Sequence, residues 1–481
     1  MERRATRWMF GRKSVFSSGV CVGVSCFGRA PLPCFGNAPA RTIPVKARDK
    51  VTIELVNTGS ELLLGRVLNT HQQWLCRQLA DHGHVVTRQV AVSDAAPAIR
   101  DAVREALARA DCVIVTGGLG PTCDDRTREL IAGLLGRELR HQPAVEESIR
   151  RFFESRNRPV PAGTRVEALV PEGAEVLPNR QGTAPGLALA LDPNPFRPGH
   201  AAWLAMLPGP PRELRPMFLE HALPRLLQRF PPAPGFTCRT LKTTGLGESL
   251  MEERLAQPLA ELVAQGMDLG FCARVGEVDV RFVAHGSRAP ELVAEAERRT
   301  RAVAGEFIFG SEDESLEAVV VRTLAARGRT LATAESCTGG HMANRITNVP
   351  GASAVLRAGW VPYANEAKQS CLGVPESVLR EHGAVSEPVA RAMAEGARRA
   401  AGADFAVATT GIAGPTGAVP GKPVGTVFIA VAGPAGTVVH RQLNVFDRET
   451  FKFLTTQQAL ALLLRQPGLA GAEGKGPAST P

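Results

Sequence analysis

The sequence predicts an α/β protein built from three successive domains. Its 481 residues exceed the length of one ordinary domain, and short β-branched runs alternate with amphipathic helical windows from residue 51 onward. The proline-rich segment 230–236 interrupts this alternation, because three prolines and a glycine cannot continue a helix or a central strand. We therefore expect domains at residues 51–229, 237–310 and 311–465, with a linker at 230–236.

The first domain alternates strands and helices along the chain. The expected strands are residues 51–56, 85–92, 111–116, 186–191 and 201–207. The expected helices are residues 69–82, 96–110 and 211–229. Because each early strand feeds a helix, we expect a parallel sheet that is covered on both faces.

The second domain is a small α+β unit, and the third returns to the α/β pattern. In the second domain we expect strands at 237–243, 268–274 and 277–285, and helices at 248–265 and 290–303. In the third we expect helices at 315–327 and 448–465, and strands at 330–334, 405–409 and 425–431.

Positive charge is concentrated at the amino end of the chain. Residues 1–50 contain ten basic and two acidic side chains, so that +8 of the formal net charge of +9 lies there. Such a leader is typical of an organelle transit peptide, or of a disordered extension from an over-long start. Residues 466–481 are rich in Gly, Ala and Pro, which predicts a disordered tail.

The remaining composition limits the partners and the compartment. Without its leader the chain is close to neutral, which argues against nucleic acid as a partner. The apolar stretch 15–27 is too short to span a bilayer, and we expect no membrane association. The seven cysteines after residue 50 include no Cys-x-x-Cys pair, which argues against a zinc site and disulfides. We therefore expect a cytoplasmic protein, or an organellar one if the leader is a transit peptide.

Two loops at expected strand ends are suited to phosphate chemistry. Residues 57–65 and 117–125 are glycine-containing segments, and glycines let backbone N–H groups approach phosphate oxygens closely. Glu61, Asp124 and Asp125 add carboxylates, which would repel phosphate unless a divalent cation of the Mg²⁺ type bridged them. The alternative is that these acids only cap helices and that the glycines only form turns.

Four segments of the first domain resemble the amino domain of the CinA family, namely residues 58–65, 116–125, 182–186 and 207–214. The resemblance implies a molybdopterin-binding-like fold, metal-dependent hydrolysis of ADP-ribose and a homodimer. It also implies that Glu61, Asp124 and Asp125 lie in the nucleotide and metal site. Three further residues are implied to lie near the phosphates: Gly118, Gly120 and Thr122. The sequence leaves open which carboxylate binds the metal.

The middle domain resembles the small KH-like domain of the same family at residues 244–249 and 276–281. A KH domain that binds nucleic acid clamps the backbone with a Gly-x-x-Gly loop. Gly245 and Gly247 have the wrong spacing for that loop. We therefore expect a structural spacer or a dimerisation unit.

The third domain carries a candidate nucleophile and base. Ser336 follows an expected strand at a strand-to-helix turn, where Gly339 and Gly340 would free the helix N-terminus to hold an anion. Lys368, 32 residues further on, could act as the base if burial lowers its pKa. Residues 409–415 could supply backbone N–H donors for a phosphate or an oxyanion. The alternative is that Ser336 caps a helix and that Lys368 is a surface lysine.

Four segments of this domain resemble the CinA carboxyl domain, namely residues 334–340, 363–368, 382–386 and 410–415. That domain is a nicotinamide-nucleotide amidase, which converts nicotinamide mononucleotide to nicotinic acid mononucleotide and ammonia without a cofactor. The resemblance implies Ser336 as nucleophile, Lys368 as base, and Tyr363 and Thr410 as supporting groups. The implied substrate-binding residues are Thr338, Gly339, Gly340, Asn365, Gly411 and Gly414.

Two other interpretations remain open. The chain could be a non-enzymatic nucleotide-binding regulator or scaffold, or its amino domain could bind a molybdopterin-related ligand. The presence of both Ser336 and Lys368 favours an enzyme. His341 and Ala364 differ from the Leu and Ser that the family leads us to expect, which affects fine specificity rather than the class of reaction.

Overall fold

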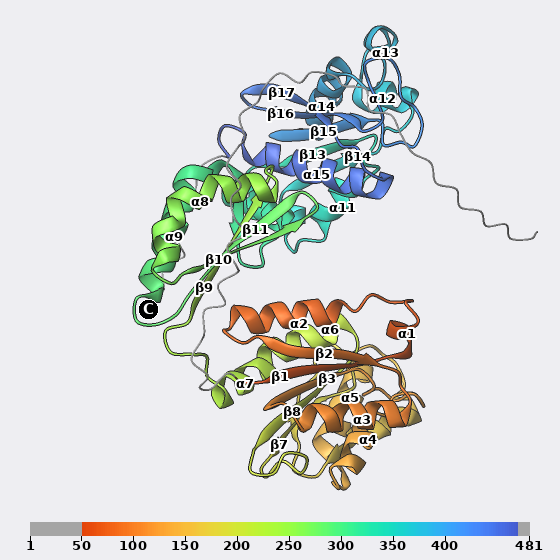
Figure 1. Cartoon of the computed structure of the whole chain (residues 1–481). Coiled ribbons are helices and arrows are strands. Elements are labelled where there is room, and N and C mark those ends of the chain that lie inside the picture. The colour runs from red at the N-terminus through yellow and green to blue at the C-terminus, as the bar shows by residue number, and fades with distance from the viewer. Residues whose placement is uncertain (1–50, 470–481) are drawn as a thin grey trace, which may run out of the picture. The chain divides into compact units, whose positions relative to one another are not determined.

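The computed structural model describes residues 51–469 and contains three successive domains (Figure 1). The expected leader at 1–50 and most of the expected tail at 466–481 lie outside the described residues. The first four residues of that tail form a turn that ends at the buried Leu469. None of the helices within residues 51–469 combines the length and the apolarity needed to cross a membrane. The predicted multi-domain α/β fold class is confirmed.

The amino domain is built on a six-stranded sheet of order β2-β1-β3-β8-β7-β6. The strands of this domain are β1 (Ile53–Thr58), β2 (Val86–Val92), β3 (Cys112–Thr116), β4 (Leu139–His141), β5 (Leu169–Pro171), β6 (Glu175–Leu177), β7 (Gly186–Leu191) and β8 (Ala202–Leu207). Its helices are α1 (Ser60–Leu63), α2 (Thr70–Asp81), α3 (Ala96–Leu107), α4 (Thr127–Leu134), α5 (Pro143–Glu154), α6 (Pro211–Met217) and α7 (Leu223–Arg229).

The expectation of a wholly parallel sheet is wrong at one edge. Strands β2, β1, β3 and β8 pair in parallel, whereas β7 runs antiparallel to β8, and β6 runs antiparallel to β7. The reason is local, because the turn at 192–201 returns the chain directly beside β7 without a crossover helix. The parallel strands still bring the ends of β1 and β3 to one edge, where both glycine-containing loops begin.

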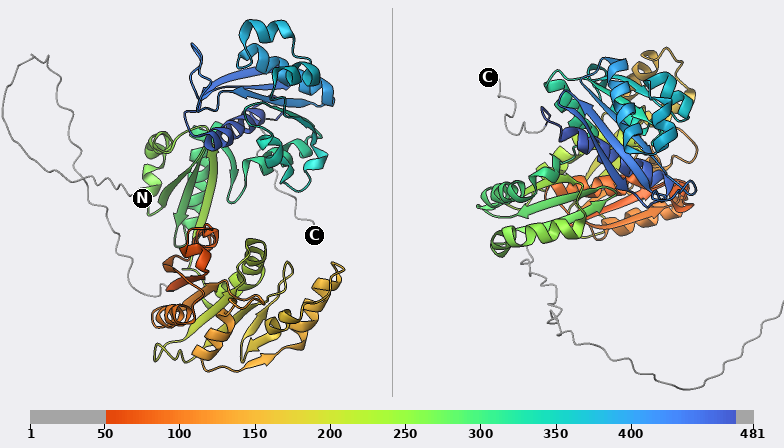
Figure 2. Two further views of the ribbon diagram at one scale, coloured as in Figure 1. Left: turned by 90° about the vertical axis from the view of Figure 1, so that its right-hand side faces the viewer. Right: turned by 90° about the horizontal axis from the view of Figure 1, so that it is seen from above.

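Each face of this sheet packs on its own set of helices. Successive side chains of a strand point to opposite faces, so that Leu55 and Ile114 join one apolar cluster while Val56 and Val115 join the other. The first cluster contains residues of α2, α6 and α7, and the second contains residues of α3, α4 and α5. Figures 1 and 2 show this three-layer arrangement.

The KH-like domain has a four-stranded antiparallel sheet of order β10-β11-β9-β12. Its elements are β9 (Thr237–Thr244), α8 (Glu248–Ala264), β10 (Asp268–Arg274), β11 (Glu277–Ala284), α9 (Ala289–Ala304) and β12 (Ile308–Ser311). Helices α8 and α9 share one apolar cluster with side chains of β9 and β11. The sequence did not predict β12, which is short and half-buried.

The carboxyl domain has a five-stranded sheet of order β14-β13-β15-β16-β17. Its strands are β13 (Leu331–Glu335), β14 (Leu356–Trp360), β15 (Phe405–Gly411), β16 (Thr426–Gly433) and β17 (Gly436–Leu443). Its helices are α10 (Leu316–Ala326), α11 (His341–Thr347), α12 (Asn365–Leu372), α13 (Glu376–His382), α14 (Glu387–Ala401) and α15 (Arg448–Leu464).

The two faces of the carboxyl sheet differ in side-chain size. Alanines of β13, β15 and β16 lie on the face that packs against α12, α13 and α14. Larger side chains such as Val407 and Ile429 lie on the face that packs against α10, α11 and α15. Small side chains let a helix approach the sheet closely, and α14 makes such an approach along the Ala-rich face. Ser336 follows β13 directly, and the chain then enters α11, which packs with α15 on this face of the sheet.

Candidate functional site

The loop after β3 fits closely between β1 and α4 in the amino domain. Gly117 and Gly118 adopt positive φ angles of 97° and 67°. A Cβ atom at Gly117 would lie 2.6 Å from the carbonyl oxygen of Thr58, and one at Gly118 would overlap the hydroxyl of Thr127. Both positions therefore require glycine, for their φ angles and for the close approach.

Thr122 brings two of the predicted metal-binding carboxylates together. Its backbone N–H donates to Asp125 Oδ2 over 3.1 Å. Its hydroxyl lies 2.5 Å from the same Asp125 oxygen and also contacts Asp124 Oδ1. One hydroxyl proton cannot serve both carboxylates at once. The hydrogen bond from Thr122 holds the pKa of Asp124 below its ordinary value. Asp125 packs over Gly120, where a Cβ would lie 2.5 Å from its Oδ2.

Glu61 lies apart from this pair in the structure. It is exposed in α1 and turns back over Gly59, where a Cβ would lie 2.6 Å from its Oε1. Within residues 51–469, no group of three or more His, Cys, Asp or Glu side chains is close enough to hold a metal ion.

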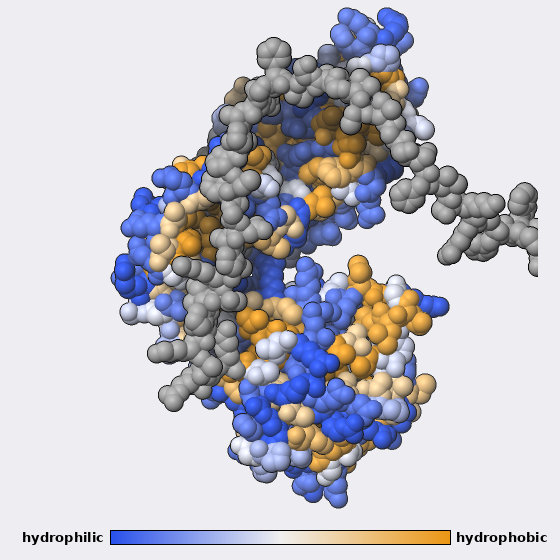
Figure 3. All heavy atoms as spheres, in the orientation of Figure 1, coloured by the Kyte–Doolittle hydropathy of each residue, from blue (hydrophilic) through white to orange (hydrophobic). Residues whose placement is uncertain are grey.

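Figure 3 shows apolar surface at the end of the domain where α1 lies, to which the exposed residues Leu63, Leu64, Val67 and Leu68 belong.

The sequence did not predict two titratable side chains that are buried behind the loop, Arg128 and Glu167. Arg128 is 1% exposed and donates from Nη1 to Leu119 O over 3.1 Å, while its Nε and Nη2 have no described partner. Glu167 is 0% exposed and accepts from the Thr183 hydroxyl, while its Oε2 has no described partner. Burial raises the pKa of Glu167 to about 7 and lowers the pKa of Arg128. Of these two residues, only Arg128 could have been singled out from the sequence, because it lies close to the Asp124-Asp125 motif.

Two segments of the amino-domain resemblance meet at Glu213. Asn179 donates to Glu213 Oε2 over 2.9 Å and accepts from the backbone N–H of Gly182 over 2.9 Å. A Cβ at Gly182 would overlap the Glu213 carboxylate. Segments 182–186 and 207–214, which are far apart in the sequence, therefore form one side of the same site.

In the carboxyl domain, Ser336 lies directly after β13 in a turn that is fixed at both ends. Its backbone N–H donates to Thr409 O over 2.9 Å. The preceding Glu335 is buried and accepts from the N–H groups of Met342 (2.9 Å) and Ala343 (2.8 Å). A carboxylate therefore occupies the N-terminus of α11, and the expectation that this terminus is free for an anion is wrong.

The turn still offers unused donors in front of that helix. None of the backbone N–H groups from Cys337 to Gly340 donates to an oxygen of the described chain. Thr338, predicted to bind substrate, directs its hydroxyl instead to Glu335 Oε2 and Thr409 Oγ1, at 2.7 Å each. This buried network fixes the shape of the turn.

Lys368 is a buried lysine rather than a surface one. It is 1% exposed, and its Nζ donates to the carbonyl oxygens of Pro362 (3.0 Å) and Tyr363 (3.1 Å). Burial lowers its pKa, which favours the neutral amine. A neutral amine with both N–H groups bonded to carbonyls keeps its lone pair available as a base.

Lys368 is also electrostatically coupled to the Ser336 turn. Burial raises the pKa of Cys337 to about 12, and the charge of Lys368 partly opposes this effect. Within the described residues, Lys368 Nζ and Ser336 Oγ form no hydrogen bond. Catalytic hydrogen bonds often tighten only when substrate is bound. A Cβ at Gly340 would lie 3.4 Å from Cγ2 of Val361, next to the Pro362 carbonyl that Lys368 binds, so the two predicted residues lie in one region. Their direct contact stays a prediction.

Arg448 is a third residue of the candidate sites that the sequence did not predict. It begins α15 and donates to the Tyr363 hydroxyl over 2.6 Å and to Gly414 O over 3.0 Å. Tyr363 is 60% exposed, so that its ring borders open space. Arg448 thus joins two predicted site segments that lie 85 and 34 residues before it.

A cavity of about 700 Å³ lies beside this arginine. Its walls include His341, Arg448 and Lys452, and a Cβ at Gly339 would lie 3.7 Å from Lys452 Nζ. The pKa of His341 is lowered by burial and by the charges of Arg345 and Lys452. Two cationic residues of α15, Arg448 and Lys452, therefore line this cavity.

The remaining predicted residues occupy different places. Thr410 is buried and donates to Ala384 O over 2.7 Å, which ties β15 to the loop before α14. Gly411 packs against β16, where a Cβ would lie 2.8 Å from Thr426 O, and Gly414 has a φ of 76°. Asn365 is exposed at the first turn of α12.

Fold and site together define a three-domain α/β protein with two separate candidate centres. Family models match all three domains. The model described as a probable molybdopterin binding domain matches residues 54–228, the damage-inducible protein CinA KH domain matches 238–310, and the CinA C-terminal domain matches 313–466.

Known proteins match the same arrangement. The chain is 45% identical over 416 residues to a CinA-like protein of Akkermansia muciniphila, covering 86% of this chain and 97% of that protein. It is 46% identical over 427 residues to a putative competence-damage inducible protein of Symbiobacterium thermophilum, covering 86% and 98%. A solved competence/damage-inducible protein from Agrobacterium tumefaciens is 38% identical over 32% of this chain and 98% of that one, with a TM-score of 0.30. The chain belongs to the CinA family.

Proposed function

We propose that the chain is a hydrolase of pyridine nucleotides whose carboxyl domain converts nicotinamide mononucleotide to nicotinic acid mononucleotide and ammonia. The observation that carries the proposal is the burial of Lys368, whose amine donates to the carbonyl oxygens of Pro362 and Tyr363. The neighbouring Val361 approaches the turn after Ser336, since its Cγ2 would lie 3.4 Å from a Cβ at Gly340. A lysine in such surroundings is suited to take a proton from a serine hydroxyl.

The proposed reaction uses only groups of this chain and water. Ser336 Oγ attacks the carboxamide carbon while Lys368 accepts the hydroxyl proton. The unused N–H groups of the turn that follows Ser336 stabilise the negative oxygen. Lys368 then returns the proton to the leaving nitrogen, ammonia departs, and water hydrolyses the ester on Ser336 with Lys368 again as the base.

The substrate phosphate is proposed to bind at α15 rather than at α11. Glu335 already accepts from the second and third N–H groups of α11, and the first, that of His341, donates to Thr338 O. Arg448 and Lys452 line the adjacent cavity, and both carry positive charge toward it. An arginine and a lysine together can neutralise a phosphate dianion. In this proposal Tyr363 lies beside the nucleotide, oriented by its hydrogen bond from Arg448.

The amino domain is proposed to be a second, metal-dependent centre that cleaves the pyrophosphate of ADP-ribose. Mg²⁺ commonly binds through one or two carboxylates together with substrate phosphates, and Asp124 and Asp125 form such a pair. A cation there would also offset the repulsion between the two carboxylates, which share one Thr122 hydroxyl proton. Glu61 would join this centre only through movement of α1.

The experiment that tests the amidase is ammonia release from nicotinamide mononucleotide by the full chain. Ser336→Ala should reduce it to background, while Ser370→Ala, which changes an exposed serine of α12, should retain it. Full activity in Ser336→Ala would refute the assignment of the nucleophile. Binding of nucleotides without any turnover by the unaltered chain would favour the scaffold interpretation.

A further inference from the structure

The turn between β10 and β11 of the KH-like domain packs on the amidase domain. Gly276 in this turn has a φ of 73°, and a Cβ there would lie 2.9 Å from Leu454 Cδ1 and 3.1 Å from Gln457 Cγ of α15. The neighbouring Val275 is 45% exposed and forms part of the wall of the cavity that contains Arg448 and Lys452. One wall of the candidate substrate cavity therefore comes from another domain.

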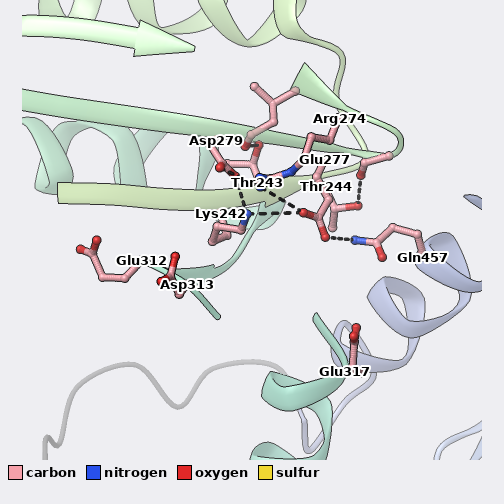
Figure 4. Close-up of polar contacts among 12 residues, drawn as sticks. Lys242, Thr243, Thr244, Arg274, Glu277, Asp279, Glu312, Asp313, Glu317 and Gln457 are labelled. Atoms are coloured by element: carbon pink, nitrogen blue, oxygen red, sulfur yellow. Dashed lines mark hydrogen bonds and ion pairs between the residues drawn. The ribbon is translucent and has the colours of Figure 1, made fainter. Parts of the chain in front are cut away.

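A buried glutamine links this turn to the amidase helices. Gln457 Nε2 donates to Glu277 Oε1 over 2.8 Å, and Gln457 Oε1 accepts from Arg345 Nη2 over 2.6 Å. Figure 4 shows Glu277 directed toward Gln457 of α15. The side-chain amide of Gln457 therefore forms one hydrogen bond to each of the two domains.

Arg345 carries the connection to the nucleophile turn. It lies in α11, which begins directly after Gly340, and it is almost completely buried. It donates to Thr456 Oγ1 over 2.9 Å and to Glu317 Oε2 over 2.8 Å, and its guanidinium lies 4.9 Å from the ring centroid of Phe453. Arg345 therefore fixes α11 against α15, the two helices that border the cavity.

The other end of the connection is anchored in a charge cluster. Lys242 is buried and pairs with Asp279 over 2.5 Å and with Glu277 over 3.4 Å. Arg274 pairs with Asp279 over 2.6 Å and with Glu277 over 3.5 Å. Each cation thus retains Asp279 when Glu277 is replaced, so a neutral residue at 277 leaves no buried charge alone.

We propose that the 274–277 turn of the KH-like domain is a functional wall of the amidase cavity, with Val275 facing the nucleotide phosphate and Glu277 acting as a positioning residue through Gln457 and Arg345. This inference rests on the proposed amidase function for its substrate. It assigns the KH-like domain a role in the reaction beyond that of a spacer.

The first test introduces a negative charge into the cavity wall at position 275. Val275→Asp should raise the KM for nicotinamide mononucleotide on the order of tenfold, because a carboxylate would repel the substrate phosphate, and should leave the KM for nicotinamide riboside, which lacks the phosphate, unchanged. Val275→Asn, similar in size but neutral, should raise this KM much less than Val275→Asp does. Equal effects of Asp and Asn, or equal effects on both substrates, would overturn the assignment of Val275.

The second test separates positioning from stability. Glu277→Ala should lower kcat about two- to tenfold, the equivalent of one hydrogen bond, and should increase amide hydrogen exchange in residues 336–347. Glu277→Gln, which keeps an acceptor for Gln457, should restore both. Gln458→Ala is the matched control, since Gln458 bonds to Asn444 within the amidase domain.

Hydrogen exchange keeps the positioning test independent of the proposed function. If the unaltered chain releases no ammonia, the amidase proposal fails, while exchange in residues 336–347 still reports on the connection. Unchanged exchange and unchanged kcat in Glu277→Ala would overturn the positioning role, and so would a Glu277→Gln variant that behaves like Glu277→Ala.

Discussion

The protonation state of Glu167, which is buried behind the amino-domain loop, can be tested. Its side chain is fully buried, and its pKa rises from an ordinary 4.5 to about 7 because burial disfavours the carboxylate. Arg128 opposes this effect without overcoming it. The folded protein therefore keeps a proton that the unfolded chain has already lost between pH 4.5 and 7.

The sign and size of the effect follow from proton linkage. Because the folded state binds more protons in this range, the free energy of unfolding falls as pH rises and levels off above pH 7. At 1.36 kcal/mol for each pH unit, the full loss is about 3 kcal/mol. About 2 kcal/mol of it falls between pH 5.5 and 8. Glu167→Gln, which resembles the protonated acid, should remove this dependence.

Urea unfolding followed by tryptophan fluorescence measures the change. Trp74 and Trp203 lie in the amino domain, so Trp8 and Trp360 are replaced by Phe to isolate its transition. The difference in free energy of unfolding between Glu167→Gln and its parent should grow by about 2 kcal/mol from pH 5.5 to 8. Glu129→Gln, at an exposed position of α4, is the control. A constant difference would refute the protonated state, and a difference that shrinks would indicate a true ion pair with Arg128.

Three further predictions concern the two candidate centres. Lys368→Arg should lower ammonia release about 10²–10⁴-fold, because a guanidinium stays protonated. In the unaltered chain kcat/KM should rise with pH through a pKa below 10.5. Normal activity of Lys368→Arg would contradict the role of Lys368 as the base. Lys452→Ala should raise the KM for nicotinamide mononucleotide with little change in kcat, whereas Arg380→Ala, on the exposed part of α13, should change neither. Chelation with EDTA should abolish ADP-ribose cleavage, as should Asp125→Asn, and cleavage that persists in EDTA would exclude the metal.

Local pattern was sufficient where an element is long or strongly periodic. The expected helix 69–82 and the expected strands 85–92 and 405–409 occur with shifted ends, whereas the expected helix 211–229 is divided into α6, a π-helical turn at Phe218–Ala222, and α7. Strands β14 and β17 and helices α12 to α14 were not predicted. The two strands lie at sheet edges, where alternate or partial exposure weakens the apolar signal. The expectation of a wholly parallel sheet was wrong for β7 and β8, because a turn rather than a crossover helix connects these two strands.

The candidate site in the carboxyl domain likewise contains residues that the sequence predicted and residues that only the fold shows. Ser336 and Lys368 were found because each belongs to a short motif with its own chemistry. Arg448 and Lys452 were not, since two cations in a helix have no distinctive pattern until α15 packs beside Gly339. Glu335 was within a predicted motif, yet only the fold shows that its carboxylate occupies the N-terminus of α11.

The sequence by itself determined the α/β class, the succession of three domains and the two loops that carry candidate chemistry, because strand and helix periods and glycine turns are local properties. The tertiary structure decided which distant groups share a site and which are buried. Burial lowers the pKa of Lys368 and raises that of Glu167, and packing brings Val275 of the KH-like domain into the wall of the cavity lined by Arg448 and Lys452. Such effects depend on desolvation and on contacts across long sequence separations, which no local pattern records.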